Sequence, residues 1–209
     1  MAKGASGFLG SAYGAPDPAS LRRVYDQWAG TYEQDMARSG YRHPAIVLAM
    51  LARWLPAGAT PILDAGCGTG LLGPLLEIAG YPEVIGLDLS SSMLAAAQAS
   101  GAYTDLVQAD LSTGLPLPTD KFAGVVSAGV FTTGHVRADA LAGLVRVCRP
   151  GGLMVLTVKT TLWEAGLAAG LEDMAERGQI DVLGLTEPYL SLPGEEQGVP
   201  SLCVAVRVR

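Results

Sequence analysis

A short apolar segment that runs directly into a cluster of glycines constrains this chain more than any other feature of its sequence. Residues 61–64 read Pro-Ile-Leu-Asp, which is typical of a buried strand, and glycines follow at positions 66, 68 and 70. Glycine at a strand-to-helix turn lets the backbone approach a bound nucleotide, because no Cβ is in the way and positive φ angles are allowed. The segment is therefore predicted to form a strand, a ligand-binding turn and the start of a helix.

The chain after this turn alternates between strand and helix patterns. Strands are predicted at 83–89, 106–109, 124–128 and 153–158, and helices at 71–79, 91–99, 138–147 and 162–177. Such alternation implies right-handed βαβ crossovers and a mainly parallel sheet, with the ligand at the carboxyl ends of the strands. Two further apolar runs, 180–190 and 201–208, are too close together for a helical crossover, so they are predicted to pair antiparallel at one edge. The predicted fold class is α/β, with one Rossmann-like, doubly wound, mainly parallel seven-stranded sheet and an antiparallel C-terminal hairpin.

The N-terminal part of the chain has a different pattern. Residues 1–18 are rich in Gly, Ala, Ser and Pro without apolar periodicity, so they are predicted to form a flexible arm. Apolar residues between 20 and 36 recur at spacings of three and four, and a second such run follows Pro44, so two helices are predicted there. A length of 209 residues favours one domain over 19–209, since a domain has on the order of 150 residues.

The charge and the cysteines argue against several classes of partner. With 14 basic and 20 acidic residues the net charge is −6, which disfavours binding to nucleic acid or to an anionic membrane surface. Cys67, Cys148 and Cys203 lack the spacing of a zinc site or a disulfide framework, and no cluster of acids predicts a divalent metal. No apolar run is long enough for a membrane helix, and the N-terminus is too weakly apolar for a secretory signal. A cytoplasmic location is therefore expected.

The glycine loop can be aligned in two registers. Residues 66–70 fit GxGxG, whereas residues 68–73 fit the GxGxxG pattern of dinucleotide-binding proteins. Asp64 favours the first register, because a carboxylate two residues before the first glycine would repel a pyrophosphate but could hold an ammonium group. Asp88 could accept both ribose hydroxyls in either register, and Asp110 could accept from an adenine amine. A nicotinamide-dependent oxidoreductase stays as an alternative, although no Tyr-x-x-x-Lys pair or other hydride-transfer site follows the fourth strand.

Five short segments of the chain form a recognisable combination: ILDAGCGTG (62–70), VIGLDLSSSML (84–94), QADL (108–111), VVSAG (125–129) and RPGG (149–152). Together they resemble the class I S-adenosylmethionine-dependent methyltransferases. Within that family, the segment VYDQWAGTYEQD (24–35) is similar to the small methyltransferase-like group named for the Williams-Beuren region. The resemblance implies a methyltransferase domain with a helical lid at 19–57 on the Rossmann-like core at 61–209. It also implies S-adenosylmethionine as cofactor and S-adenosylhomocysteine as product.

The resemblance also implies which residues contact the cofactor. They are Tyr25, Trp28, Tyr32, Asp64, Ala65, Gly66, Cys67, Gly68, Gly70, Asp88, Leu89, Met93, Asp110, Leu111 and Ser127. Asp64 would face the methionine end and Asp88 the ribose hydroxyls, while Leu89 and Met93 would pack beside the adenine. The aromatic residues of the first helix match the family's lid, although an aromatic stripe at helical spacing is also typical of a helix face packed on a core.

The reaction needs little from the protein beyond positioning and exclusion of water, because the methyl group of a sulfonium is already activated. His135 follows the fourth strand and is the candidate general base, with helix capping as the alternative role. Phe131 and Trp163 could line an acceptor pocket or belong to the core. Cys67 is expected to be a packing residue and not a nucleophile, because no histidine lies near it in sequence.

The expected function is S-adenosylmethionine-dependent methyl transfer to a small-molecule acceptor, with an oxygen, nitrogen, sulfur or carbon atom as the target. The fourth strand is followed by Ser-Ala-Gly-Val-Phe and not by an Asn or Asp with two prolines and an aromatic, which argues against the amino groups of nucleic-acid bases. The main alternative is a protein that binds S-adenosylmethionine or S-adenosylhomocysteine without transferring a methyl group, because a fold does not fix a function.

Overall fold

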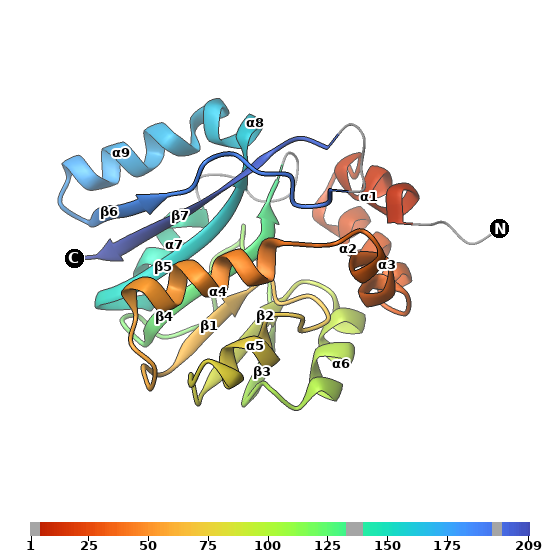
Figure 1. Ribbon diagram of the computed structural model, residues 1–209, viewed down its shortest axis with the longest axis horizontal. Helices are drawn as coiled ribbons and strands as arrows, with labels where there is room; N and C mark the ends of the chain where they lie inside the picture. The colour runs from red at the N-terminus through yellow and green to blue at the C-terminus, as the bar shows by residue number, and fades with distance from the viewer. Residues whose placement is uncertain (1–4, 133–139, 194–197) are drawn as a thin grey trace.

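A single mixed β-sheet organises the molecule (Figure 1). The computed structural model describes residues 5–132, 140–193 and 198–209. The strands of the described residues are β1 (Ile62–Ala65), β2 (Val84–Asp88), β3 (Asp105–Gln108), β4 (Phe122–Phe131), β5 (Cys148–Lys159), β6 (Ile180–Leu185) and β7 (Ser201–Val208). The helices are α1 (Ala5–Tyr13), α2 (Pro18–Trp28), α3 (Tyr32–Arg38), α4 (His43–Trp54), α5 (Gly73–Ile78), α6 (Ser91–Ser100), α7 (Ala140–Val147), α8 (Thr160–Leu162), the π-helical turn η1 (Trp163–Leu167) and α9 (Ala168–Glu176).

The strand order is β3-β2-β1-β4-β5-β7-β6. Strands β1 to β5 pair in parallel, whereas β7 is antiparallel to both of its neighbours, β5 and β6. The prediction of a mainly parallel seven-stranded sheet with an antiparallel C-terminal pair is confirmed. Strand β5 begins earlier than predicted, because Cys148 pairs with Phe122 and brings the Arg-Pro-Gly-Gly segment into the strand.

Helices cover both faces of the sheet. Side chains of successive strand residues point to opposite faces, so neighbouring residues of one strand show which helices pack on each side. Ile62 belongs to the buried cluster that includes residues of α4, α5 and α6, and its neighbour Leu63 belongs to the cluster that includes residues of α7 and α9. Figure 1 shows α4 lying in front of the strands. The inner parallel strands β1, β2, β4 and β5 are thus largely buried on both sides, which explains their apolar sequences, whereas the edge strand β3 is partly exposed.

The N-terminal segment departs from the sequence prediction in two ways. Residues 5–13, predicted to be part of a flexible arm, form helix α1, because the ring of Phe8 stacks on Trp28 with centroids 5.3 Å apart and gives the helix an apolar contact. The helix predicted over residues 20–36 is interrupted, since α2 ends at Trp28 and α3 begins at Tyr32. The start of α2 follows its sequence signals, with Pro18 at the first turn and the Asp17 carboxylate accepting from the backbone N–H of Ser20 at 2.7 Å.

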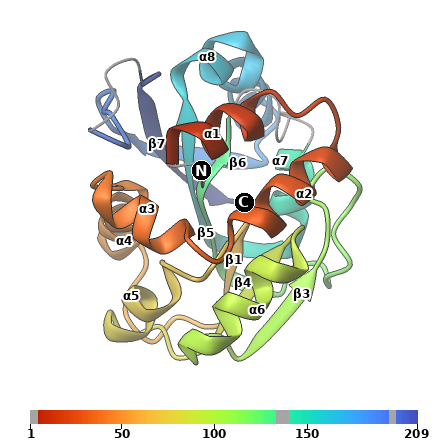
Figure 2. The same cartoon turned by 90° about the vertical axis from the view of Figure 1, so that its right-hand side faces the viewer.

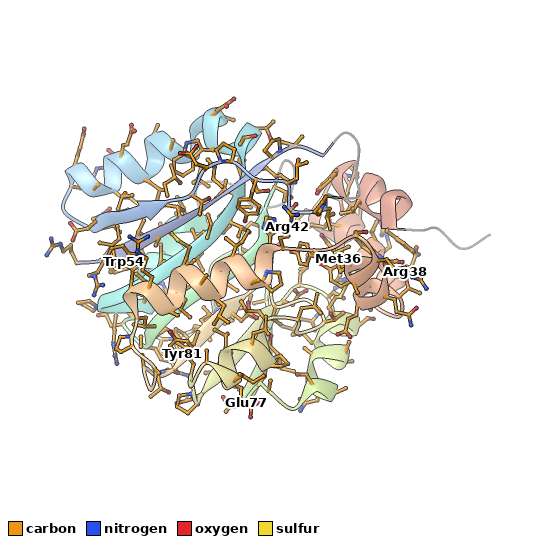
Figure 3. The ribbon with its side chains drawn as sticks, viewed as in Figure 1. Met36, Arg38, Arg42, Trp54, Glu77 and Tyr81 are labelled. Carbon is orange, nitrogen blue, oxygen red and sulfur yellow. The ribbon has the colours of Figure 1, made fainter. Side chains whose placement is uncertain are left out.

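Helices α1 to α3 lie across the end of the sheet to which the parallel strands point (Figure 2). Asp26 on α2 joins them to the core, because its carboxylate accepts from Ser90 Oγ at 2.5 Å and from Ser92 N at 3.4 Å at the start of α6. On α3, Met36 is buried among aromatic side chains, while Arg38 faces outward (Figure 3). These three helices therefore cover the carboxyl ends of the strands, where ligands bind in this class of sheet.

In the part of the chain that the structure describes, no helix is both long and apolar enough to span a membrane. The same residues contain no group of three or more His, Cys, Asp or Glu side chains placed to hold a metal ion.

Candidate cofactor and acceptor site

The glycine loop between β1 and α5 is fixed on the end of β2. The N–H groups of Gly66 and Cys67 both donate to the carbonyl of Leu87, at 2.7 and 3.0 Å. Gly66 has φ +83°, and a Cβ there would overlap the side chain of Val130, so only glycine fits. Gly68 also has a positive φ, but open space lies where its Cβ would point. The loop therefore leaves its backbone accessible on one side.

Asp88 stands at the end of β2 and faces this opening. One of its carboxylate oxygens accepts from Gly68 N at 2.8 Å, and the other accepts from Ser90 N at 2.9 Å. Burial raises the pKa of Asp88, and these backbone donors partly oppose the effect. Because each carboxylate oxygen has more than one acceptor site, Asp88 can still accept from two hydroxyls of a ligand.

A first cavity opens beside Asp88, between α2 and the ends of β1, β2 and β4. Nine of the predicted cofactor residues line it: Tyr25, Tyr32, Gly66, Gly68, Asp88, Leu89, Met93, Asp110 and Leu111. The cavity therefore combines a carboxylate at its rim with the apolar side chains that a flat heterocycle needs. This lining suits a nucleoside.

A second cavity adjoins the first at the glycine loop and contains two buried polar groups. Asp64 is 1% exposed and accepts from the hydroxyl of Tyr103 at 2.8 Å. Burial raises the pKa of Asp64 to about 7, and the hydrogen bond from Tyr103 lowers it less than burial raises it. The hydroxyl of Thr69 is buried without a hydrogen-bond partner in the described structure. The second cavity thus offers an acceptor for a cation and a donor for an anion.

A third cavity, the aromatic chamber, lies under α1, α2 and α3. Its lining is Leu9, Tyr13, Tyr25, Trp28, Tyr32, Met36, Tyr41, His43, Gly129, Thr132, Lys159, Ser191 and Leu192. Trp28 is the fixed centre of one wall, because its ring packs against Tyr25 and Tyr32 and its indole N–H donates to Asp35 at 2.8 Å. Five of the lining residues are tyrosine or tryptophan, so this side of the chamber is rich in aromatic rings.

The opposite end of the chamber is polar. The ammonium of Lys159, a residue 8% exposed at the end of β5, donates to the carbonyl of Val199 at 2.6 Å and to Ser191 Oγ at 3.3 Å. His43 Nδ1 lies 2.8 Å from the hydroxyl of Tyr189. Burial, with a smaller contribution from the charge of Lys159, lowers the pKa of His43 to about 3, so His43 is neutral at pH 7.

Tyr32 is the residue that lines all three cavities. Gly129 lines both the first cavity and the aromatic chamber, and Ala128 lines the first and second cavities. Burial raises the pKa of Tyr32 well above its ordinary value, so its hydroxyl stays protonated at neutral pH. The three cavities therefore meet at Tyr32 and the end of β4.

The other predicted cofactor residues lie in three different places. Asp64 and Cys67 line the second cavity, where burial raises the pKa of the Cys67 thiol. Trp28 lines the aromatic chamber and not the first cavity, because its ring turns toward Asp35. The remaining three, Ala65, Gly70 and Ser127, line none of the three cavities. Ser127 is buried and donates to the carbonyl of Ala65 at 2.7 Å.

The residues predicted for the acceptor side are not brought together. Phe131 is fully buried in the core cluster that includes residues of α7, and Trp163 packs against the same cluster, so neither lines the aromatic chamber. His135 lies outside the described residues. Sequence reasoning missed Tyr41 and Lys159, although a lysine directly after a buried strand was a signal that pointed to the carboxyl edge of the sheet.

Comparison with known proteins identifies the family. Residues 62–152 match the family described as methyltransferase domain. Over 186 residues the chain is 35% identical to human methyltransferase-like protein 27, a match that spans 88% of this chain and 75% of that protein. The chain belongs to the S-adenosylmethionine-dependent methyltransferases.

A solved methyltransferase and a shorter match extend the comparison. The crystal structure of a TehB-like S-adenosylmethionine-dependent methyltransferase from Corynebacterium glutamicum aligns with a TM-score of 0.63 and 26% identity over 90% of this chain and all (100%) of that one. The chain is also 41% identical over 66 residues to the 18S rRNA (guanine(1575)-N(7))-methyltransferase of Saccharomyces cerevisiae. This match spans 32% of this chain and 24% of that protein. The prediction of a class I methyltransferase with S-adenosylmethionine as cofactor is confirmed. The narrower placement in the Williams-Beuren-region group stays a prediction.

Proposed function

We propose that this methyltransferase transfers the methyl group of S-adenosylmethionine to a small molecule held in the aromatic chamber. The observation that carries the proposal is the meeting of three cavities at Tyr32. A donor whose nucleoside fills the first cavity and whose methionine fills the second has its sulfonium at this meeting point. The methyl group then faces the chamber.

The residues of the first two cavities fit this donor. Asp88 accepts from the ribose hydroxyls, while Leu89 and Met93 pack against the adenine. In the second cavity, Asp64 accepts from the ammonium and the unpartnered hydroxyl of Thr69 donates to the carboxylate. The cofactor supplies an activated methyl group, so the protein's task is to hold the donor and acceptor in line and to exclude water.

Two observations favour a small acceptor over ribosomal RNA. Five of the residues that line the chamber are tyrosine or tryptophan, which suits a small ligand with a ring better than a polyanionic chain. The net charge of −6 also works against binding a polyanion. The buried thiols of Cys67, Cys148 and Cys203, which form no disulfide, support a cytoplasmic setting for the reaction.

A calorimetric titration followed by a label-transfer assay tests the proposal. S-adenosylmethionine and S-adenosylhomocysteine are expected to bind at micromolar concentration, and NAD is expected not to bind. Methyl-labelled S-adenosylmethionine is then supplied with either the low-molecular-weight fraction of a cell extract or purified ribosomal RNA. Label is expected in a small molecule. Label in the RNA would overturn the acceptor class, and tight cofactor binding without transfer to either fraction would favour a non-catalytic binding protein.

A further inference from the structure

We propose that Tyr103 is a positioning residue for the methyl donor, because its hydroxyl fixes the Asp64 carboxylate as the acceptor of the donor's ammonium group. The proposal deepens the proposed function and rests on it, since it treats the second cavity as the site of the methionine group. The observations that carry it are the two hydrogen bonds of the Tyr103 hydroxyl and the slot that glycines leave for the Tyr103 ring.

The Tyr103 hydroxyl joins two parts of the donor site. Tyr103 is buried and lies in the segment between α6 and β3, about thirty residues from the glycine loop. Its hydroxyl donates to the carboxylate of Asp64 at 2.8 Å and accepts from Gly73 N at 3.1 Å. Asp64 belongs to β1, and Gly73 is the first residue of α5. One side chain therefore ties the strand before the glycine loop to the helix after it.

The ring of Tyr103 occupies a slot that glycines leave open. A Cβ at Gly73 would lie 2.6 Å from this ring, and a Cβ at Gly70 or Gly86 would lie 3.0 Å from it. Gly73 has no positive φ, so its backbone conformation does not require glycine. The three atoms nearest to a Cβ at Gly73 all belong to Tyr103. Gly73 is therefore glycine because it makes room for Tyr103.

This slot accounts for the second register of the glycine loop. Gly73 is the last glycine of the GxGxxG pattern at residues 68–73. In dinucleotide-binding proteins the third glycine of this pattern allows close packing of the helix on the strand. In this chain the space is filled by Tyr103, whose hydroxyl binds the carboxylate two residues before the loop. Gly73 therefore supports Asp64 and does not indicate a pyrophosphate site.

Asp64 depends on the hydrogen bond from Tyr103. The Asp64 carboxylate is buried, and in the part of the chain that the structure describes no other side chain donates to it. Burial raises the pKa of Asp64 to about 7, the hydrogen bond from Tyr103 lowers it, and the charge of Asp88 adds a smaller rise. Burial and the charge of Asp64 raise the pKa of Tyr103 well above its ordinary value, so its hydroxyl stays protonated. Tyr103 therefore stabilises the ionised form of Asp64, which is the form that binds an ammonium group.

The other titratable side chains that line the second cavity do not compete for this role. They are Tyr32, Tyr41 and Cys67, and burial raises the pKa of each of them. All three therefore stay uncharged at neutral pH. Asp88 lines the first cavity, where the nucleoside binds, so adenosine reports on Asp88 separately. A change in the binding of the amino-acid group near neutral pH can thus be assigned to Asp64.

The test compares the unmodified chain with Tyr103→Phe, which keeps the ring in its slot and removes the hydroxyl. S-adenosylhomocysteine and adenosine are each titrated by calorimetry from about pH 5.5 to about pH 8.5. Loss of the hydrogen bond to the ionised carboxylate is expected to lower S-adenosylhomocysteine affinity about tenfold at pH 7. The pH below which this affinity declines is expected to rise by about one pH unit. Adenosine lacks the amino-acid group and is expected to bind both proteins equally within about twofold.

Tyr81→Phe is the matched control. Tyr81 is also buried, its hydroxyl donates to the carbonyl of Leu55 at 2.8 Å, and it lines none of the three cavities. Tyr81→Phe therefore loses a buried hydrogen bond and is expected to lower the free energy of unfolding without moving the pH dependence of S-adenosylhomocysteine binding. If it moved the pH dependence as Tyr103→Phe does, the effect would be a general loss of stability and the proposal would fail.

Gly73→Ala tests the slot and decides the question by the same readouts if Tyr103→Phe does not fold. The added methyl group displaces the Tyr103 ring, so S-adenosylhomocysteine affinity should fall and the pH of its decline should rise. In a Tyr103→Leu background, which lacks the end of the ring, Gly73→Ala is expected to have little further effect. An equal loss of affinity in both backgrounds would contradict the proposal, because Gly73 would then act without Tyr103.

The outcomes separate this proposal from the proposed function. If Tyr103→Phe binds S-adenosylhomocysteine with the affinity and pH dependence of the unmodified chain, the role of Tyr103 is refuted and the proposed function stands. If Tyr103→Phe weakens adenosine binding as much as S-adenosylhomocysteine binding, Tyr103 supports the whole loop and the proposal also fails. If the unmodified chain does not bind S-adenosylhomocysteine, the proposed function itself fails.

Discussion

The first cavity and the aromatic chamber share Tyr32 but are built in different ways. The first cavity is lined largely by short stretches at or just after the carboxyl ends of β1, β2, β3 and β4, and backbone groups fix its geometry. These stretches are residues 66 and 68, 87–89, 109–111 and 128–130. The chamber is lined by side chains of α1, α2, α3, α4 and β5 and of residues 191–192, which are far apart in sequence. Donor binding therefore depends on loop conformation, whereas acceptor binding depends on which side chains the helices present.

Removing the carboxylate of Asp88 is expected to have the largest effect on donor binding. Asp88→Ala should reduce affinity for S-adenosylmethionine by roughly 10- to 100-fold, because hydrogen bonds to a charged group contribute about 1.5–3 kcal/mol. Calorimetry measures the change, with the exposed Asp105→Ala as the matched control. If Asp88→Ala bound the donor normally, Asp88 would not hold the ribose and the assignment of the first cavity would be lost.

Donor affinity is expected to change with pH through Asp64, whose pKa is about 7 in the free protein. The ammonium of the donor favours the ionised carboxylate, so the pKa of Asp64 falls when the donor binds. Binding then requires loss of a proton below pH 7, and affinity should fall by up to about tenfold per pH unit between pH 7 and 5.5.

Two comparisons isolate this pH effect. Adenosine lacks the methionine group, so its affinity should stay nearly constant over the same range. Asp64→Asn should remove the pH dependence of S-adenosylmethionine binding. A pH dependence that persists in Asp64→Asn would assign the proton to another group and leave the second cavity without its cation site.

Thr69→Val tests the other polar group of the second cavity. The Thr69 hydroxyl is buried without a hydrogen-bond partner among the described residues, so its removal should not lower the free energy of unfolding. Affinity for S-adenosylmethionine should nevertheless fall about three- to tenfold, the value of one hydrogen bond. Adenosine affinity is the internal control and should not change. A loss of stability with unchanged donor affinity would give Thr69 a purely structural role.

The smallest effect is expected where α2 joins the start of α6. Asp26→Ala removes the acceptor for Ser90 Oγ and Ser92 N, so hydrogen exchange in α2 should accelerate and donor affinity should fall about two- to fivefold. Glu33→Ala, an exposed acid on α3, is the matched control. Unchanged exchange in α2 would show that aromatic packing alone holds α2 in place.

The sequence predicts the first cavity better than the chamber, for a physical reason. Its polar groups lie within contiguous motifs, so the spacing of Gly66, Gly68 and Asp88 already implies their proximity once the strands are parallel. The chamber depends on the directions in which side chains point, and the spacing of residues in the sequence does not encode these directions. Tyr25 and Trp28 share a predicted helix face, but the end of α2 at Trp28 and the bond to Asp35 turn the indole away from the first cavity.

The two predicted acceptor aromatics show the same limit. Phe131 lies at the carboxyl end of β4, the expected place for a ligand contact, but the strand's register shifts between Ser127 and Phe131, and its ring is buried in the core. Lys159 occupies the corresponding end of β5 and lines the chamber. Position at the carboxyl edge was predictable, whereas the direction of each side chain was not.

A crystal structure of the complex with S-adenosylhomocysteine tests the central claim most directly. The account predicts the ribose on Asp88, the amino-acid group between Asp64 and Thr69, and the sulfur beside Tyr32 and facing an open aromatic chamber. A ligand whose sulfur points away from the chamber, or whose amino-acid group occupies the chamber, would contradict the division between donor and acceptor sites.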